Sequence, residues 1–138
     1  MRDSHRGGFG KITAREAFEK SSNIGISRIV HDNYKDNPRR FVDRLYAMGL
    51  HKPLGIEIKG EGEPKIKYPG DNSWSGVTLP WMSIGYEVKL TPLQILALYN
   101  AVANNGRMMK PMFAKGVSQH GQMLKKYEPE VLNPSICS

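Results

Sequence analysis

The stretch KLTPLQILALYNAVANNG, residues 89–106, carries the strongest structural signal in the sequence. Thr91 is a favourable N-cap, Pro92 suits the first helical position, and Gly106 suits the end of a helix. The apolar side chains of the stretch lie around most of the helix circumference; they are Leu93, Ile95, Leu96, Leu98, Tyr99 and Val102. A helix that is apolar on most faces is buried on most faces. We therefore expect part of the surface that covers this helix to come from sequence outside these 138 residues.

Residues 108–132, which follow this helix, predict a β-hairpin. Apolar residues alternate weakly on both sides of the run QHGQ, which has the composition of a turn, so that Met112–Ser118 would pair with Met123–Tyr127. Asn133-Pro134 then has the pattern of a helix cap followed by a first helical residue. We expect a truncated helix start over residues 133–138.

Three more helices are expected towards the N-terminus. Thr13 and Glu16 match a capping box, which starts a helix at Ala14. Residues 24–33 carry a second apolar stripe at helical spacing, and a third helix opens at Pro38 and ends at Gly49. Together with residues 89–106, these segments form an expected helical lobe over residues 13–106.

The remaining sequence between residues 50 and 80 is rich in loops, with one short strand expected over Gly55–Lys59. At 138 residues the chain is expected to form a single domain, 1–138, since domains commonly span ~100–200 residues. The predicted fold class is mainly α with a small β-hairpin, that is, α+β.

The composition excludes several classes of function. The net charge of +7 comes from scattered basic residues that are not interleaved with stacking aromatics, so no nucleic acid partner is expected. The four histidines lack the spacing of metal ligands, and neither a metal nor a cofactor is expected. No window approaches the ~20 apolar residues of a membrane span, and no signal-peptide core lies near the start, so the chain itself is expected to be soluble.

Ser21-Ser22-Asn23 stands where a helical pattern should continue, inside the run EAFEKSSNIGI. Serine and asparagine favour helix ends, so an ordinary break followed by a new cap explains the run from local sequence alone. The alternative is a functional pair. On a continuous helix residues 21 and 23 lie ~200° apart, whereas in a short connection between two helices both side chains can point to one side. A hydroxyl and a carboxamide would then act together on a peptide amide.

Two blocks of the sequence resemble the transpeptidase domain of class B penicillin-binding proteins, the periplasmic enzymes that cross-link peptidoglycan. ITAREAFEKSSNIGISRIV resembles the region around that family's Ser-x-Asn motif. WSGVTLPWMSIGYEVKLTPLQILALYNAVANNGRMMKP resembles the next well-marked block. The resemblance covers nearly the whole chain from about Gly10, and it implies the helical lobe of the penicillin-binding and serine β-lactamase-like transpeptidase fold.

The resemblance also implies roles for individual residues. Ser21 would be the hydroxyl of Ser-x-Asn that carries a proton to the leaving group, and Asn23 would hold a catalytic lysine and the acyl side-chain amide of the substrate. Ser22, the variable middle residue, would be structural. The family's two other motifs, Ser-x-x-Lys and Lys-Thr-Gly, do not occur in these 138 residues. The chain alone is therefore expected to be inactive, because the nucleophile is among the missing groups.

The implied parent protein is a serine-type D,D-transpeptidase at the periplasmic face of the bacterial inner membrane. Its partners would be peptidoglycan stem peptides, β-lactams, the rest of the transpeptidase domain and the cell-wall synthesis machinery. The alternative is a non-catalytic relative of the same fold that senses peptidoglycan or β-lactams. The exposed apolar faces of an isolated chain could drive its self-association.

Overall fold

The computed structural model describes residues 1–5 and 7–137. It is mostly helical with a few short strands, which confirms the predicted fold class. The helices are α1 (Ala14–Glu19), α2 (Asn23–Tyr34), α3 (Pro38–Ala47), α4 (Thr78–Met82) and α5 (Pro92–Ala103). The strands are β1 (Lys65–Ile66), β2 (Val88–Lys89), β3 (Met108–Met109), β4 (Gly116–Gln119), β5 (Gln122–Lys126) and β6 (Val131–Asn133).

The chain divides into two compact units, each built from two segments. Unit 1 consists of Met1–Arg44 and Lys65–Lys89, and unit 2 consists of Leu45–Pro64 and Leu90–Ser138. The expected single domain over residues 1–138 stays a prediction.

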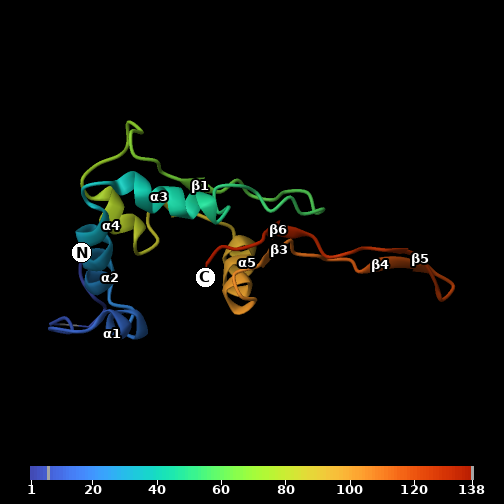
Figure 1. Ribbon diagram of the computed structural model, residues 1–138, viewed down its shortest axis with the longest axis horizontal. Coiled ribbons are helices and arrows are strands. Elements are labelled where there is room, and N and C mark those ends of the chain that lie inside the picture. Colours follow the sequence, from blue (N-terminus) through green and yellow to red (C-terminus); the bar gives the residue numbers. More distant parts are fainter. Residues whose placement is uncertain (6, 138) are drawn as a thin grey trace. The chain divides into compact units, whose positions relative to one another are not determined.

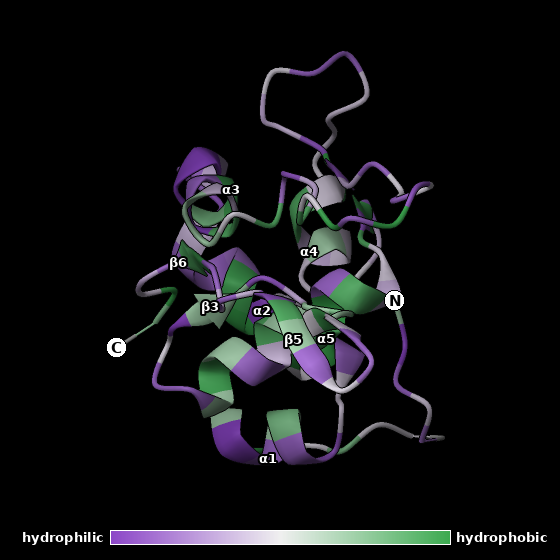
Figure 2. Cartoon of the chain, turned by 90° about the vertical axis from the view of Figure 1, so that its right-hand side faces the viewer, coloured by the Kyte–Doolittle hydropathy of each residue, from purple (hydrophilic) through white to green (hydrophobic). Residues whose placement is uncertain are grey.

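In unit 1, α2 packs against both α1 and α4 (Figure 1). The predicted capping box is present at the start of α1: Thr13 Oγ1 accepts the Glu16 backbone N–H at 3.2 Å, and Glu16 Oε2 accepts the Thr13 backbone N–H at 2.8 Å. Both hydrophilic and hydrophobic residues occur in α1 and in α3 (Figure 2), as expected for helices with one exposed side. α4 was not predicted, because it has only five residues and no side-chain cap.

The short strand expected over Gly55–Lys59 is wrong. The Glu61 carboxylate accepts backbone N–H groups from Leu54, Gly55 and Ile56, so a side chain takes up these donors in place of a neighbouring strand. In unit 1, the antiparallel pair of β1 and β2 lies elsewhere in the sequence, with Ile66 opposite Val88.

Unit 2 is organised around α5. Thr91 caps the helix as predicted, and the side chain of Gln94 returns to the Thr91 backbone N–H at 2.9 Å. Gln94 Nε2 also donates to the Lys52 carbonyl oxygen at 2.9 Å, which ties the preceding loop to the first turn. β3 contacts α5 and pairs antiparallel with β6.

The hairpin of β4 and β5 is present, and Figure 1 shows it projecting away from β3 and β6 within the same unit. Its turn is at His120-Gly121, as predicted, but the first strand begins at Gly116 and not at Met112. Asn133 ends β6 and accepts the Ser135 backbone N–H at 3.0 Å. Asn133 therefore makes a cap-like hydrogen bond, but residues 134–137 form no helix, so the helix start expected over 133–138 is wrong for the residues that are described.

The burial of α5 differs from the pattern expected for an all-round apolar helix. The buried residues are Gln94, Ala97 and Ala101. The large apolar residues on another side are exposed; they are Ile95, Leu96, Tyr99 and Val102. The small side chains of Ala97 and Ala101 let β3 approach α5 closely. The larger apolar side chains of α5 are not covered by other residues that the structure describes. Within residues 1–5 and 7–137, none of the helices has the length and apolarity that crossing a bilayer requires.

Candidate active site

α1 ends in a Schellman motif, and Ser21 occupies its left-handed position. The C-cap of α1 is Lys20, the Ser21 N–H donates to the Phe18 carbonyl at 3.0 Å, and the Ser22 N–H donates to the Ala17 carbonyl at 2.8 Å. Ser21 has a φ of +49°. Glycine usually fills this position, because a Cβ is unfavourable in the left-handed region. A serine here gives up some local stability to place a hydroxyl at the helix end.

α2 begins one residue later, with Ser22 as its N-cap. Ser22 is only 2% exposed, and its Oγ accepts the Gly25 backbone N–H at 3.0 Å. Gly25 also allows the two helices to approach closely: a Cβ at this position would lie 2.7 Å from the Cβ of Ala17. The connection between α1 and α2 is therefore short and tightly packed.

The break that the functional interpretation of residues 21–23 requires is present. Ser21 is exposed, and its hydroxyl makes no hydrogen bond within the part of the chain that is described. Asn23 is half-buried, and its Nδ2 donates to the Arg2 carbonyl oxygen at 3.3 Å. The two candidate residues thus lie on either side of the buried Ser22, at the start of one helix. Their joint action on a substrate stays a prediction.

Asn23 lines a cavity of about 370 Å³ in unit 1. The other lining residues are Met1, Arg2, Trp81, Ile84 and Tyr86. The rings of Trp81 and Tyr86 are in contact, with centroids 5.9 Å apart and planes at 52°. Such an apolar wall beside a single carboxamide suits a ligand that has both an amide and an apolar part. The sequence had not indicated these two aromatic residues, because no spacing rule relates them to Asn23.

Electrostatic interactions stabilise the N-terminus of α1, the helix that Ser21 follows. The backbone N–H of Thr13, and then its hydroxyl, donate to the Glu16 carboxylate and hold the pKa of Glu16 below its usual range. An ionised carboxylate in the first turn is also favourable to the helix dipole. The described residues contain no group of three or more side chains that could hold a metal ion.

The sequence matches the family profile described as Penicillin binding protein transpeptidase domain over residues 2–136. Penicillin-binding protein PbpB of Mycobacterium tuberculosis is 29% identical over 131 residues, which cover 94% of this chain and 19% of that protein. Peptidoglycan D,D-transpeptidase FtsI of Escherichia coli is 28% identical over 98 residues, which cover 71% of this chain and 16% of that protein. The chain therefore spans less than a fifth of the length of these two relatives.

Solved structures show the same similarity in three dimensions. The crystal structure of penicillin-binding protein 3 from M. tuberculosis, complexed with aztreonam, has a TM-score of 0.75 and 28% identity to this chain. The match covers 99% of this chain and 30% of the other. The ampicillin complex of the same protein has a TM-score of 0.76 at 28% identity, over 99% of this chain and 29% of the other.

Proposed function

Because the chain belongs to the family of penicillin binding protein transpeptidase domains, we propose that it contributes to a serine-type D,D-transpeptidase. This enzyme cross-links peptidoglycan stem peptides and is acylated by β-lactams. The observation that carries the proposal is the break between α1 and α2, which puts Ser21 and Asn23 on either side of a buried residue at one helix start. The family's Ser-x-Asn motif corresponds in order and spacing to these residues.

Acylation begins with a serine hydroxyl that is supplied by the Ser-x-x-Lys motif, which is not among these 138 residues. Its oxygen attacks the carbonyl carbon of the penultimate peptide bond, or of a β-lactam ring. The C–N bond breaks, the acyl group stays on the serine oxygen as an ester, and the proton lost by the hydroxyl ends on the leaving nitrogen. Ser21 Oγ relays this proton: it accepts one proton and passes its own to the nitrogen. Its exposure at the helix end leaves it free for both contacts.

Asn23 holds the acyl part of the substrate. A carboxamide has two N–H donors and one carbonyl acceptor, of which one donor reaches the Arg2 carbonyl oxygen. The second N–H and Oδ1 are left for the catalytic lysine and for an amide of the substrate. The apolar part of the acyl group would lie against the cavity wall that contains Trp81 and Tyr86.

The exposed apolar side of α5 supports the proposal that the rest of the transpeptidase domain covers this side of the helix. Leu96, Tyr99 and Val102 are each more than half exposed, which is unusual for large apolar side chains on one helix. We propose that the complete protein acts at the periplasmic face of the bacterial inner membrane, together with the cell-wall synthesis machinery. The similar penicillin-binding protein 3 of M. tuberculosis forms complexes with two β-lactams, aztreonam and ampicillin.

The test is covalent labelling with a fluorescent penicillin. The complete protein, expressed from the open reading frame that encodes the chain, is expected to give a labelled band. The 138-residue chain is expected to give none. Ser21→Ala in the complete protein is expected to slow labelling by about 100-fold, since proton transfer by a positioned group typically contributes 10²–10⁴-fold. Asn23→Ala is expected to slow labelling by about 100-fold as well, since a misplacement of about 1 Å can cost that much rate. Ser118→Ala is the matched control, because Ser118 is exposed on the hairpin. An unlabelled complete protein, or a labelled 138-residue chain, would overturn the proposal.

A further inference from the structure

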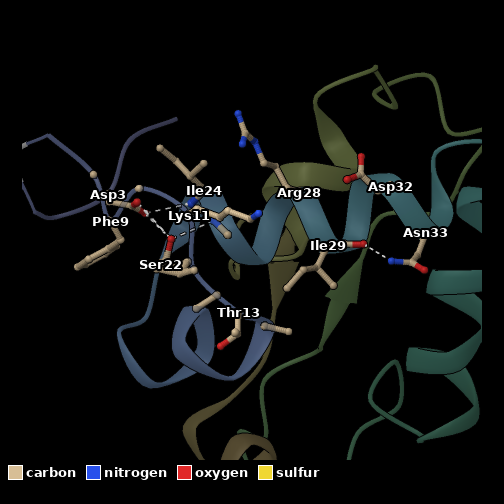
Figure 3. A pocket seen from close by; sticks show the side chains of 16 residues that line it. Asp3, Phe9, Lys11, Thr13, Ser22, Ile24, Arg28, Ile29, Asp32 and Asn33 are labelled. Atoms are coloured by element: carbon tan, nitrogen blue, oxygen red, sulfur yellow. Dashed lines mark hydrogen bonds between the residues drawn. The ribbon is translucent and has the colours of Figure 1, made fainter.

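An acidic residue near the N-terminus holds the start of α2. Asp3 Oδ1 accepts the Ile24 backbone N–H at 3.0 Å and lies 3.1 Å from Ser22 Oγ, while Asp3 Oδ2 lies 3.2 Å from the same hydroxyl (Figure 3). The Ser22 hydroxyl therefore donates to the carboxylate and, as described above, accepts the Gly25 backbone N–H. This buried hydroxyl thus acts both as a donor and as an acceptor.

The residue beside Asp3 contacts the same turn from another direction. The Arg2 carbonyl oxygen accepts from Asn23 Nδ2, so Arg2 and Asp3 together bond to three consecutive residues, Ser22, Asn23 and Ile24. The residues concerned are about 20 positions apart in the sequence, and all of them lie in unit 1. Arg2 and Asp3 thus hold the connection between α1 and α2 in place by hydrogen bonds from a separate segment of the chain.

The carboxylate suits this place electrostatically. The first backbone N–H groups of a helix lack partners within the helix, and the helix dipole favours negative charge there. Ser22 supplies one acceptor to these groups, and Asp3 supplies a second, charged one. A hydrogen bond to an ionised acceptor is about twice as strong as one between neutral groups.

We propose that Asp3 is a positioning residue for the reaction, and that it acts through the hydroxyl of Ser22 on both Ser21 and Asn23. The inference rests on the proposed function. Its physical basis is that Ser21 is held at an unfavourable φ, so the turn needs an external brace to keep a single geometry. The middle residue of the motif is then not a spacer: its hydroxyl is the point where the brace attaches. Ser22 is too deeply buried to reach a substrate itself.

The experiment uses the complete protein and four variants: Asp3→Asn, Ser22→Ala, the double variant and Glu19→Gln. The last is the control, because it removes a carboxylate that lies on the exposed side of α1 and pairs with Arg15. Labelling by a fluorescent penicillin gives the acylation rate at saturation and the concentration of half-saturation, and circular dichroism gives the folded fraction at the assay temperature.

Asp3→Asn and Ser22→Ala are each expected to lower the saturating acylation rate per folded molecule by about 10- to 100-fold, the size of loss that small misplacements of catalytic groups produce. The concentration of half-saturation should change much less. The double variant should be about as slow as Ser22→Ala alone, because Asp3 acts through the Ser22 hydroxyl and that hydroxyl is already absent in Ser22→Ala. Glu19→Gln should behave as the wild type.

A purely structural role predicts a different result, in which the loss of labelling follows the folded fraction and disappears after that correction. This result, or a wild-type rate per folded molecule in Asp3→Asn, would overturn the positioning role. If Asp3→Asn does not fold, Ser22→Ala decides by the same two criteria, and if neither folds the role is structural and the inference is wrong. An unlabelled wild-type protein would instead overturn the proposed function itself.

Discussion

Replacing Ser21 with glycine should stabilise this chain, although glycine normally weakens a helical region. Ser21 lies at φ +49°, a region that costs a residue with a Cβ roughly 1–2 kcal/mol. Glycine does not bear this penalty, but its greater freedom in the unfolded chain offsets about 0.5–1 kcal/mol. Alanine keeps the penalty and lacks the hydroxyl. We therefore expect Ser21→Gly to be more stable than Ser21→Ala by about 0.5–1 kcal/mol.

The measurement is urea unfolding of the 138-residue chain, followed by circular dichroism at equal protein concentration. Both variants lack the serine hydroxyl, so its effect on the free energy of unfolding cancels when they are compared with each other. Because Ser21 is exposed, neither substitution removes packing contacts. Arg28, an exposed residue inside α2, provides the control position. There, Arg28→Gly should be less stable than Arg28→Ala by about 1 kcal/mol, which is the usual order in a helix interior.

The outcome that contradicts this reasoning is the same order at both positions, with glycine the less stable. Ser21 would then not hold a left-handed conformation in solution, and the Schellman motif at the end of α1 would be absent. If the expected order is found, Ser21→Gly in the complete protein should combine higher stability with slower acylation. A gain in stability together with a loss of activity is typical of substitutions at residues that are retained for function at a cost in stability.

Three further predictions concern the two helices that flank residues 21–23 and the surface of α5. Gly25→Ala should lower the free energy of unfolding by about 1–3 kcal/mol, because the new Cβ would overlap Ala17, whereas Gly76→Ala, with open space around it, should change it little in the same urea titration. Glu16→Gln should flatten the pH dependence of stability: the folded-state pKa of Glu16 is lowered, so its contribution is present above its ordinary pKa and is lost as pH falls through the folded value. Equal slopes for the variant and the wild type in acid titrations would contradict this. The chain should self-associate in sedimentation velocity, and Leu96→Lys should weaken the association while Phe18→Lys, at an exposed apolar residue of α1, should not.

Features that depend on neighbouring residues were predictable from the sequence. The caps at Thr13 and Thr91 and the hairpin turn at Gly121 all arise from contacts within three or four positions, and all were found as expected. The break before Asn23 belongs to the same class, since Ser22 caps the helix that follows it. The similarity to penicillin-binding transpeptidases also came from local motifs in the right order, and the family profile confirms it.

Features that depend on contacts beyond one helical turn of sequence were missed or wrong. Glu61 draws the backbone donors of Leu54–Ile56 to its own carboxylate, so the short strand expected there does not form. Asn133 makes the cap-like hydrogen bond that its sequence indicates, yet β6 pairs with β3 and no helix follows within the described residues. In both cases the path of the chain offered the backbone groups a partner that local propensity does not include.

The sequence alone therefore determined which residues begin and end the main helices, and that Ser21 and Asn23 are separated by a helix break. Only the tertiary structure decided what surrounds that break. It brings Asp3 to the buried hydroxyl of Ser22 and the Trp81 ring to the cavity beside Asn23, through contacts that no periodicity encodes. The physical reason is the range of the interactions: capping is complete within one helical turn, whereas a brace or a cavity wall requires segments that meet only after the chain has folded.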